Sequence, residues 1–199
     1  MAKFDPVVGI KGKLGNVSFY VDKHGRQIVR AITKAKDPKT PKQLAQRAKF
    51  ALVNKSLSPL STAIRVANNG DSTVYRKFIG KAYKEAVVGE YPNFTLDYSK
   101  IEISNGQLSL PKDFIVHANI DSNILAISWE PGNSNDIVNI VCFNEADTNN
   151  SAYLERTKGS AGKATIELPY AWDSAVTHCW VYLSSRDFKS KSDSFYISL

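Results

Sequence analysis

Residues 123–144 read NILAISWEPGNSNDIVNIVCFN and contain two β-like runs, 123–130 and 136–144, with a turn between them. Both runs are rich in the β-branched and aromatic residues that favour strands. Further runs of this kind recur at regular spacing, at 114–118, 152–156, 163–169, 176–184 and 193–199. Short strands separated by turns in this way predict an antiparallel β-sandwich of the fibronectin or immunoglobulin type. Trp129 and Trp180 are expected in its core.

The beginning of the chain has a different pattern. Residues 17–21 and 27–31 are β-rich runs joined by Asp-Lys-His-Gly, which predicts a β hairpin. Residues 33–42 follow as a polar stretch with two prolines, typical of an exposed arm.

Two helices are expected after the arm. Thr40, Pro41 and Gln43 supply an N-cap hydroxyl, a proline at the first helical position and the glutamine of a capping box. They start a helix over about 41–57, and apolar residues repeating every four positions predict a second helix over about 73–88. We expect the two helices to pack on the N-terminal hairpin.

The predicted fold class is therefore α+β. Residues 1–92 form a basic N-terminal module with the hairpin, the arm and the helices, and residues 93–199 form the β-sandwich domain. Asn105-Gly106 is the strongest short-range hairpin signal in the chain and predicts an additional turn between short strands.

The charge is divided unevenly between the two halves of the chain. Residues 1–100 carry 19 Lys and Arg against 7 Asp and Glu, a net charge of +12, whereas residues 101–199 carry 7 against 12, a net charge of −5. A change of sign of this size indicates separate domains and points to the first half as the part that meets an anionic partner.

Basic side chains of the hairpin, the arm and the first helix are the candidate partner-binding residues: Arg26, Arg30, Lys34, Lys36, Lys39, Lys42, Arg47 and Lys49. They could instead neutralise nucleic-acid phosphates, with Phe19 and Tyr20 as a stacking platform. In the alternative without a partner, these basic residues only keep the arm and the helix face solvated. A basic patch without a recognised nucleic-acid motif favours a solvated or protein-binding surface over nucleic acid.

No catalytic, metal or cofactor motif is present in the sequence. His24, His117 and His178 are scattered, without Cys, Asp or Glu at ligand spacing. Cys142 and Cys179 each lie in an apolar β-like run, which indicates buried free thiols, although a disulfide could form if their strands face each other. We expect no enzyme activity, no metal and no cofactor.

The N-terminus lacks the apolar core of a secretory signal, and no stretch approaches 18 uninterrupted apolar residues. The expectation is a protein without a membrane span, located in the cytoplasm or assembled into a particle such as a virion.

The segments GKLGNVSFY, TPKQLAQRAKFALVNKSLSPL, YPNFTLDYSKIEISNGQLSLP and IELPYAWDSAVTHCWVYLSSRD span most of the chain. They resemble a family of Bacteroidota proteins known only as a domain of unknown function, which implies a two-part protein and no catalytic residues. The glycine-rich hairpin, the arm and the helix are also similar to uncharacterised proteins of phage and prophage gene clusters. The residues that match this looser pattern are Arg30, Asp37, Pro38, Thr40 and Gln43.

These observations predict a non-enzymatic structural or interaction protein. It would be a component of a larger assembly, such as a phage virion, and would dock a protein partner or another copy of itself through the basic N-terminal module and arm. Nucleic-acid binding by the same surface is the main alternative, and carbohydrate or surface adhesion by the sandwich is a lesser one.

Overall fold

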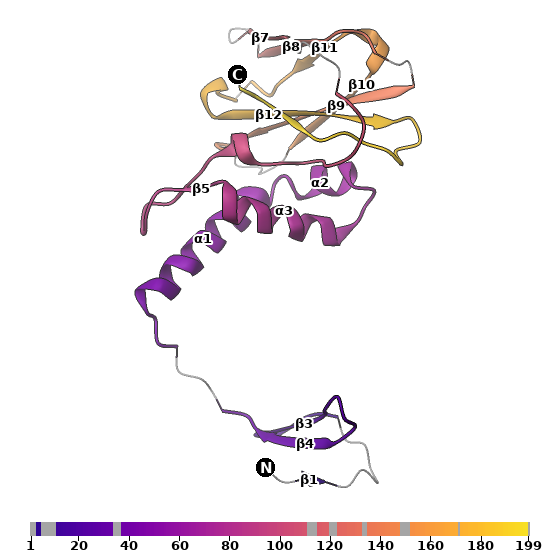
Figure 1. The fold of residues 1–199 in the computed structure, drawn as a ribbon. Helices are drawn as coiled ribbons and strands as arrows, with labels where there is room; N and C mark the ends of the chain where they lie inside the picture. Colours follow the sequence, from indigo (N-terminus) through magenta and orange to yellow (C-terminus); the bar gives the residue numbers. More distant parts are fainter. Residues whose placement is uncertain are drawn as a thin grey trace. The chain divides into compact units, whose positions relative to one another are not determined.

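The computed structural model of the chain describes residues 3–4, 11–33, 37–110, 115–119, 123–132, 135–147, 152–170 and 172–198. The backbone divides into two compact units, Met1–Thr40 and Pro41–Leu199, each of which is described by itself (Figure 1). The helices therefore share a unit with the sandwich, whereas the sequence pattern predicted a division near residue 92.

The first unit is an antiparallel sheet with the strand order β1-β4-β3-β2, formed by Lys3–Phe4, Gln27–Ala31, Val17–Val21 and Gly12–Leu14. Strands β3 and β4 are the predicted hairpin, with the predicted bounds. Asp22 closes its turn, because its carboxylate accepts a hydrogen bond of 2.8 Å from the backbone N–H of His24. Gly25 has a φ of +77°, a left-handed conformation that glycine adopts without strain.

Residues 41–85 form three α-helices: α1 (Pro41–Leu57), α2 (Ser61–Ala67) and α3 (Ser72–Glu85). The predicted bounds of α1 are confirmed, and α3 ends three residues earlier than expected because Val87–Val88 form a short strand, β5, paired with β6 (Thr95–Leu96). The side chain of Asp71 caps α3 by accepting from the N–H of Thr73 at 2.8 Å. None of these helices has the length and apolar composition needed to span a bilayer within the described residues.

The rest of the second unit is a sandwich of two antiparallel sheets. One has the order β11-β8-β7 and the other the order β10-β9-β12-β13. All seven predicted strands are confirmed to within two residues: β7 (Ile115–Asn119), β8 (Ile124–Ser128), β9 (Asp136–Asn144), β10 (Tyr153–Lys158), β11 (Lys163–Glu167), β12 (Thr177–Ser185) and β13 (Phe195–Ser198). Short 3₁₀ helices lie after β6 at Tyr98–Lys100, before β11 at Gly159–Ala161 and before β12 at Ser174–Val176.

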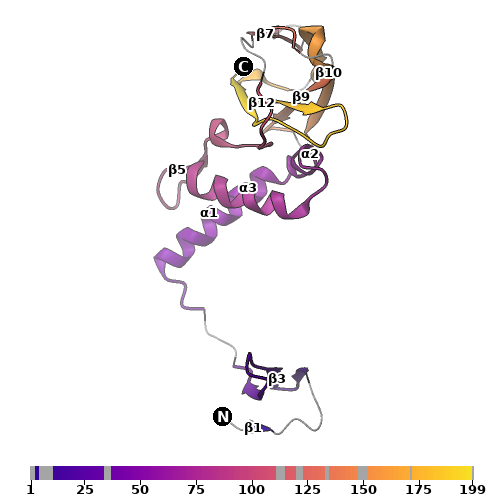
Figure 2. The same ribbon diagram turned by 45° about the vertical axis from the view of Figure 1, so that its right-hand side comes forward.

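The four-stranded sheet is buried on both of its faces. On β12, Cys179, Val181 and Leu183 face the core between the two sheets, while Trp180 and Tyr182 belong to a second core shared with the helices. Figures 1 and 2 show this layering, with β9 and β12 between the helices and the far sheet. Burial on both faces explains why β9 and β12 read as continuous apolar runs rather than alternating ones.

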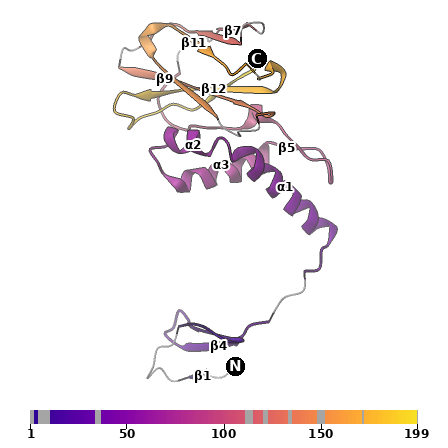
Figure 3. The ribbon, with the colours of Figure 1, turned by 180° about the vertical axis from the view of Figure 1, so that it is seen from behind.

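The helices bury their apolar residues against this sheet. Leu57, Ile64 and Phe78, one from each helix, belong to the same core cluster as Val141 of β9 and Trp180 of β12. The sequence pattern predicted that the helices pack on the N-terminal hairpin, and that prediction is wrong. Seen from behind, Figure 3 again places α2 and α3 beneath β9 and β12.

The two tryptophans lie in different cores. Trp129 packs between the sheets, as predicted, and its indole N–H donates to the Gly159 carbonyl at 2.8 Å. Trp180 points to the opposite face of its sheet, where its N–H donates to the Ile101 carbonyl at 2.9 Å. Its expected place in the sandwich core is therefore corrected.

The predicted turn at Asn105-Gly106 is also wrong. No hairpin is assigned between residues 101 and 110; this segment instead runs alongside residues 191–194. The N–H of Leu108 donates to the Lys191 carbonyl at 2.9 Å. A Cβ built on Gly106 would lie 2.1 Å from the carbonyl oxygen of Lys191. The glycine at this position is therefore explained by close backbone approach and not by a turn.

Candidate functional site

The small sheet of the first unit separates apolar from basic side chains. Residues opposite each other on antiparallel strands point to the same face, and successive residues alternate between faces. The pairing of Leu14 with Val17 and of Val17 with Ala31 sets the two faces. One face carries Leu14, Val17, Phe19, Val21, Gln27, Val29 and Ala31, and the other carries Lys13, Ser18, Tyr20, Ile28 and Arg30.

The apolar face of this sheet is partly exposed among the described residues. Leu14 is 70% exposed and Val21 is 38% exposed. Among the described residues of the first unit, Gln27 is the one that is buried. Gln27 is paired with Val21 and therefore lies on this same face, so the face is covered in part while Leu14 and Val21 leave apolar surface exposed.

The predicted partner-binding residues of the first unit differ in their surroundings. Arg26 forms an ion pair of 2.7 Å with Asp22, and hydrogen bonds from its backbone and side chain lower the pKa of the Asp22 carboxyl. Arg30 is exposed on the polar face of the sheet beside Ser18, and Lys39 is exposed in the arm. Lys34 and Lys36 lie outside the described residues.

The predicted basic residues of α1 do not share one face. At 100° per residue, Lys42 and Lys49 lie within about 20° of each other, whereas Arg47 is turned by roughly 140° from Lys42. The ammonium of Lys49 lies 4.9 Å from the ring centre of Phe94, an internal cation–π contact. Lys42 and Arg47 are exposed. The three therefore form no single basic stripe.

A cleft in the second unit is lined by three lysines that no sequence pattern singled out. It has a volume of about 340 Å³ and lies between α3, the segment after residue 101 and the loop before β13. Its lining residues are Asn68, Val74, Lys77, Phe78, Lys81, Glu102, Asn105 and Lys191. The lysines come from distant parts of the chain, so no local motif could have revealed them.

Lys191 is the most enclosed cation of this cleft. Its Nζ donates to Asn68 Oδ1 at 2.5 Å. Asn68 is held in turn, because its Nδ2 donates to the carbonyls of Ile64 and Ile103. Loss of hydration lowers the pKa of Lys191, and Asp71 opposes this effect through its charge. Across the cleft, Lys81 forms an ion pair with Glu102.

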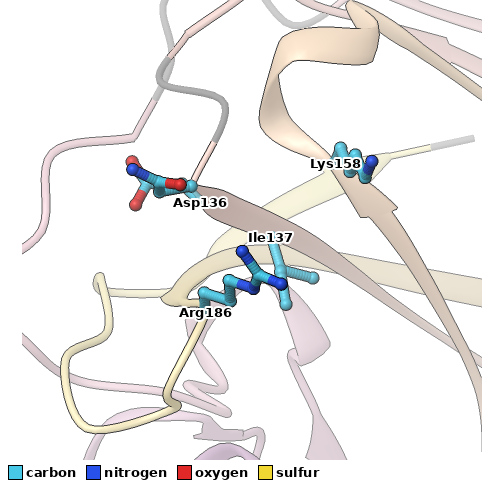
Figure 4. A pocket seen from close by; sticks show the side chains of 5 residues that line it. Asp136, Ile137, Lys158 and Arg186 are labelled. Carbon is cyan, nitrogen blue, oxygen red and sulfur yellow. The ribbon is translucent and has the colours of Figure 1, made fainter.

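A second and smaller hollow of about 210 Å³ lies at one end of the sandwich. Asp136 and Ile137 at the start of β9, Lys158 at the end of β10 and Arg186 after β12 line it together with Asn135. Figure 4 shows Arg186 and Ile137 in the middle of this view, with Asp136 on one side and Lys158 on the other. The hollow therefore offers two cations beside one carboxylate.

Strand pairing also brings an acidic residue onto a histidine. His178 Nε2 lies 2.9 Å from Glu145 Oε1, and its Nδ1 lies 2.9 Å from the hydroxyl of Tyr196. Tyr98 stacks on the imidazole at a ring distance of 4.0 Å. Burial raises the pKa of Tyr98 to about 12 and also raises the pKa of Tyr196. Both phenols therefore stay protonated at neutral pH and serve as hydrogen-bond partners.

Cys142 and Cys179 are opposite each other on β9 and β12, with their sulfur atoms 3.0 Å apart. Both are free thiols and fully buried, as the sequence pattern indicated. The N–H of Glu145 donates to the Val176 carbonyl, so the alternation of the ladder places the cysteines at a non-hydrogen-bonded pair, where side chains approach closely. Within the described residues, no group of three or more His, Cys, Asp or Glu is placed to hold a metal ion.

We expect both thiols to be inert toward a thiol reagent such as DTNB while the protein is folded. The hydrogen bond to Cys179, followed by burial, raises the pKa of Cys142, and only the thiolate reacts. Titration with DTNB should show two slow equivalents in native buffer and two rapid equivalents in denaturant. Rapid reaction in native buffer, or a mass 2 Da lower after non-reducing isolation (the loss of about one hydrogen per sulfur), would contradict this.

A family model described as "Family of unknown function (DUF6266)" matches residues 9–198. The match covers nearly the whole chain, so the chain belongs to this family. The comparison with curated proteins found no match. The association with Bacteroidota and with phage gene clusters stays a prediction.

Three solved structures are similar to part of the chain. The FN1–FN3 domains of chicken CNTN1 are 14% identical with a TM-score of 0.33, over 47% of this chain and 33% of theirs. The fn3 domain of human contactin 1 has the same identity and TM-score, over 47% of this chain and 79% of its own. A cytokine receptor complex is 10% identical with a TM-score of 0.32, over 51% and 58%. The chain thus spans a third of the length of the chicken structure, and scores this low support no inference about function.

Proposed function

We propose that this member of the family is a non-enzymatic interaction protein, a component of a larger assembly, that docks a protein surface through the small sheet of its first unit and the arm that follows. The observation that carries the proposal is the segregation of that sheet, with apolar side chains on one face and Lys13 and Arg30 on the other. An exposed apolar patch on a domain surface is typical of a protein–protein interface, and the charges on the other face can steer the partner.

Charge favours another copy of the same chain as the partner. Residues 1–40 carry nine Lys and Arg against three Asp, a net charge of +6, whereas residues 101–199 carry a net charge of −5. Opposite charges on two different surfaces of one molecule support head-to-tail contact, which produces rings or filaments. A virion or a similar repeated particle would supply such a setting.

Light scattering coupled to size exclusion, at low and high salt, tests the proposal. Leu14→Asn removes an exposed apolar side chain and should weaken association about tenfold at either salt, the loss expected for a contact worth about 1.4 kcal/mol. Arg30→Gln removes one charge and should weaken association at low salt but have little effect at high salt, where ions already screen that charge.

Lys84→Gln on α3 is the matched control, since Lys84 is exposed and belongs to the second unit. It should leave association unchanged. The proposal would be contradicted if the protein is a monomer at both salt concentrations and chemical cross-linking in the native source captures no second copy of the chain.

Nucleic-acid binding remains the second candidate, in a revised form. Phe19 and Tyr20 are neighbours on one strand and therefore point to opposite faces, so they cannot form one stacking platform. Tyr20 is 44% exposed and shares its face with Lys13 and Arg30. Fluorescence anisotropy with single-stranded DNA and RNA should then show binding that falls with salt and is lost in Tyr20→Ala. A flat response would exclude it.

We further infer that the sandwich is of the fibronectin type. Its fourth strand, β10, pairs with the third strand, β9. In an immunoglobulin constant domain the fourth strand lies in the opposite sheet. The pairing of β10 with β9 therefore favours the fibronectin type over the immunoglobulin constant type.

A further inference from the structure

The lysine cleft of the second unit is built by elements that the proposed docking surface does not use. Lys77 and Lys81 come from α3, Glu102 from the following extended segment and Lys191 from the loop before β13. Residues from three separate segments thus line a cleft of about 340 Å³, which lies within the size range of small-molecule sites.

The positive charge of the cleft is only partly matched. Its lining holds three ammonium groups and one carboxylate, and Glu102 already pairs with Lys81. Among the described residues, neither Lys77 nor Lys191 has a carboxylate within ion-pair distance. Asp71, Glu85 and Asp193 act on the cleft lysines through their charges, without forming an ion pair with Lys77 or Lys191.

Lys191 is held in place by neutral groups. Its ammonium has three N–H donors, of which one is directed at Asn68 Oδ1. The amide of Asn68 is committed to two backbone carbonyls, so the side chain cannot swing away. A partly buried cation that is fixed by a neutral acceptor and lacks a contacting anion is suited to an anionic ligand.

The cleft also has apolar walls. Phe78 is buried and Val74 is half-buried, and both lie on the side of α3 that faces the cleft. A ligand that matches both the lysines and the apolar walls carries a compact anionic group next to a small apolar or planar group. Lysines bind phosphate as point charges, and a dianion balances the net charge of +2 on the lining.

We propose that this cleft binds a small phosphate monoester, with the phosphate between Lys77, Lys81 and Lys191 and its organic group against Val74 and Phe78. Binding would add a counter-ion to Lys191 and leave the Lys81–Glu102 ion pair beside the phosphate. The site is independent of the basic sheet.

Isothermal titration calorimetry of the full chain with three probes tests this proposal. Phenyl phosphate combines the dianion with a planar body, inorganic phosphate lacks the body, and benzoate lacks the second charge. We expect saturable binding of phenyl phosphate that is at least several-fold tighter than that of either other probe, and that weakens as salt increases because charges dominate it.

The variants separate the site from general electrostatics. Lys77→Met removes an exposed lysine of the cleft and should weaken phenyl phosphate about tenfold, the scale of one charge-assisted hydrogen bond. Lys191→Met should weaken it at least as much, provided that its melting curve shows a folded protein. Lys84→Met, on the same helix but outside the lining, should bind as the unchanged chain does.

Several results would overturn the proposal. They are the absence of saturable binding for all three probes, an equal loss in Lys77→Met and Lys84→Met, or equal affinity for inorganic and phenyl phosphate. Binding of a Glu-rich peptide with no binding of the small probes would assign the lysines to a protein interface and would also overturn it.

Discussion

Replacing Trp180 with alanine is expected to lower the free energy of unfolding by about 3–5 kcal/mol, the range for deleting a large buried aromatic side chain. Trp180 is fully buried between β12 and the helices. The change removes its packing against Tyr196, whose ring lies 5.6 Å away, and leaves the Ile101 carbonyl without its indole donor. Since small domains are stable by about 5–15 kcal/mol in total, the loss should be plain in a urea titration.

The matched control is Tyr170→Ala, because Tyr170 is 93% exposed and should change stability by less than about 0.5 kcal/mol. Circular dichroism in the far ultraviolet reports on the helices during the same titration. If the helices and sandwich share a core as described, Trp180→Ala should lower the midpoints of helical and tertiary signals together or melt the helices first. An unchanged midpoint would mean that the helices do not pack on β12.

Gly106→Ala is expected to destabilise the second unit by roughly 1–3 kcal/mol, the usual cost of forcing extra atoms into a packed site. The new methyl carbon would meet the Lys191 carbonyl at 2.1 Å, so the two backbone segments must separate. Separation would break the hydrogen bond from Leu108 to Lys191 and the one from the Gly106 N–H to Asp193 Oδ1. Thermal unfolding followed by circular dichroism measures the effect.

Gly80→Ala is the control for this change. Gly80 lies inside α3, and a Cβ there would meet no atom within 4 Å. Alanine should therefore stabilise the helix by about 0.5–1 kcal/mol. The prediction for Gly106 fails if both substitutions raise the melting temperature, because a stabilising Gly106→Ala would mean that the two backbone segments are not in close contact.

Local signals predicted the elements well because the residues that encode them are neighbours in sequence. Thr40 precedes a helix that begins at Pro41, and the turn that contains Gly25 joins two strands at the expected bounds. The turn predicted at Asn105-Gly106 is wrong because the contact that decides this segment is distant in sequence. A turn signal records only what a dipeptide can do, whereas Lys191 offers this segment a partner from the far end of the chain.

The candidate sites were harder to predict than the elements. The eight basic residues chosen from the sequence are divided between two units, and those of α1 point in different directions. Lys77 and Lys191 were overlooked because an isolated lysine on a helix or in a loop is normally solvated. Glu145 and His178 meet only through the register of β9 and β12.

The sequence by itself determined the bounds of α1 and of the N-terminal hairpin, the sandwich strands to within two residues, and the gathering of basic charge in the first half. These properties arise from hydrophobic periodicity, capping and composition, which act over a few residues. Only the tertiary structure decided that the helices cover β9 and β12, that Trp180 joins them, and that three distant lysines share one cleft. Such contacts depend on which apolar surfaces bury each other most fully, and that is a property of the whole chain.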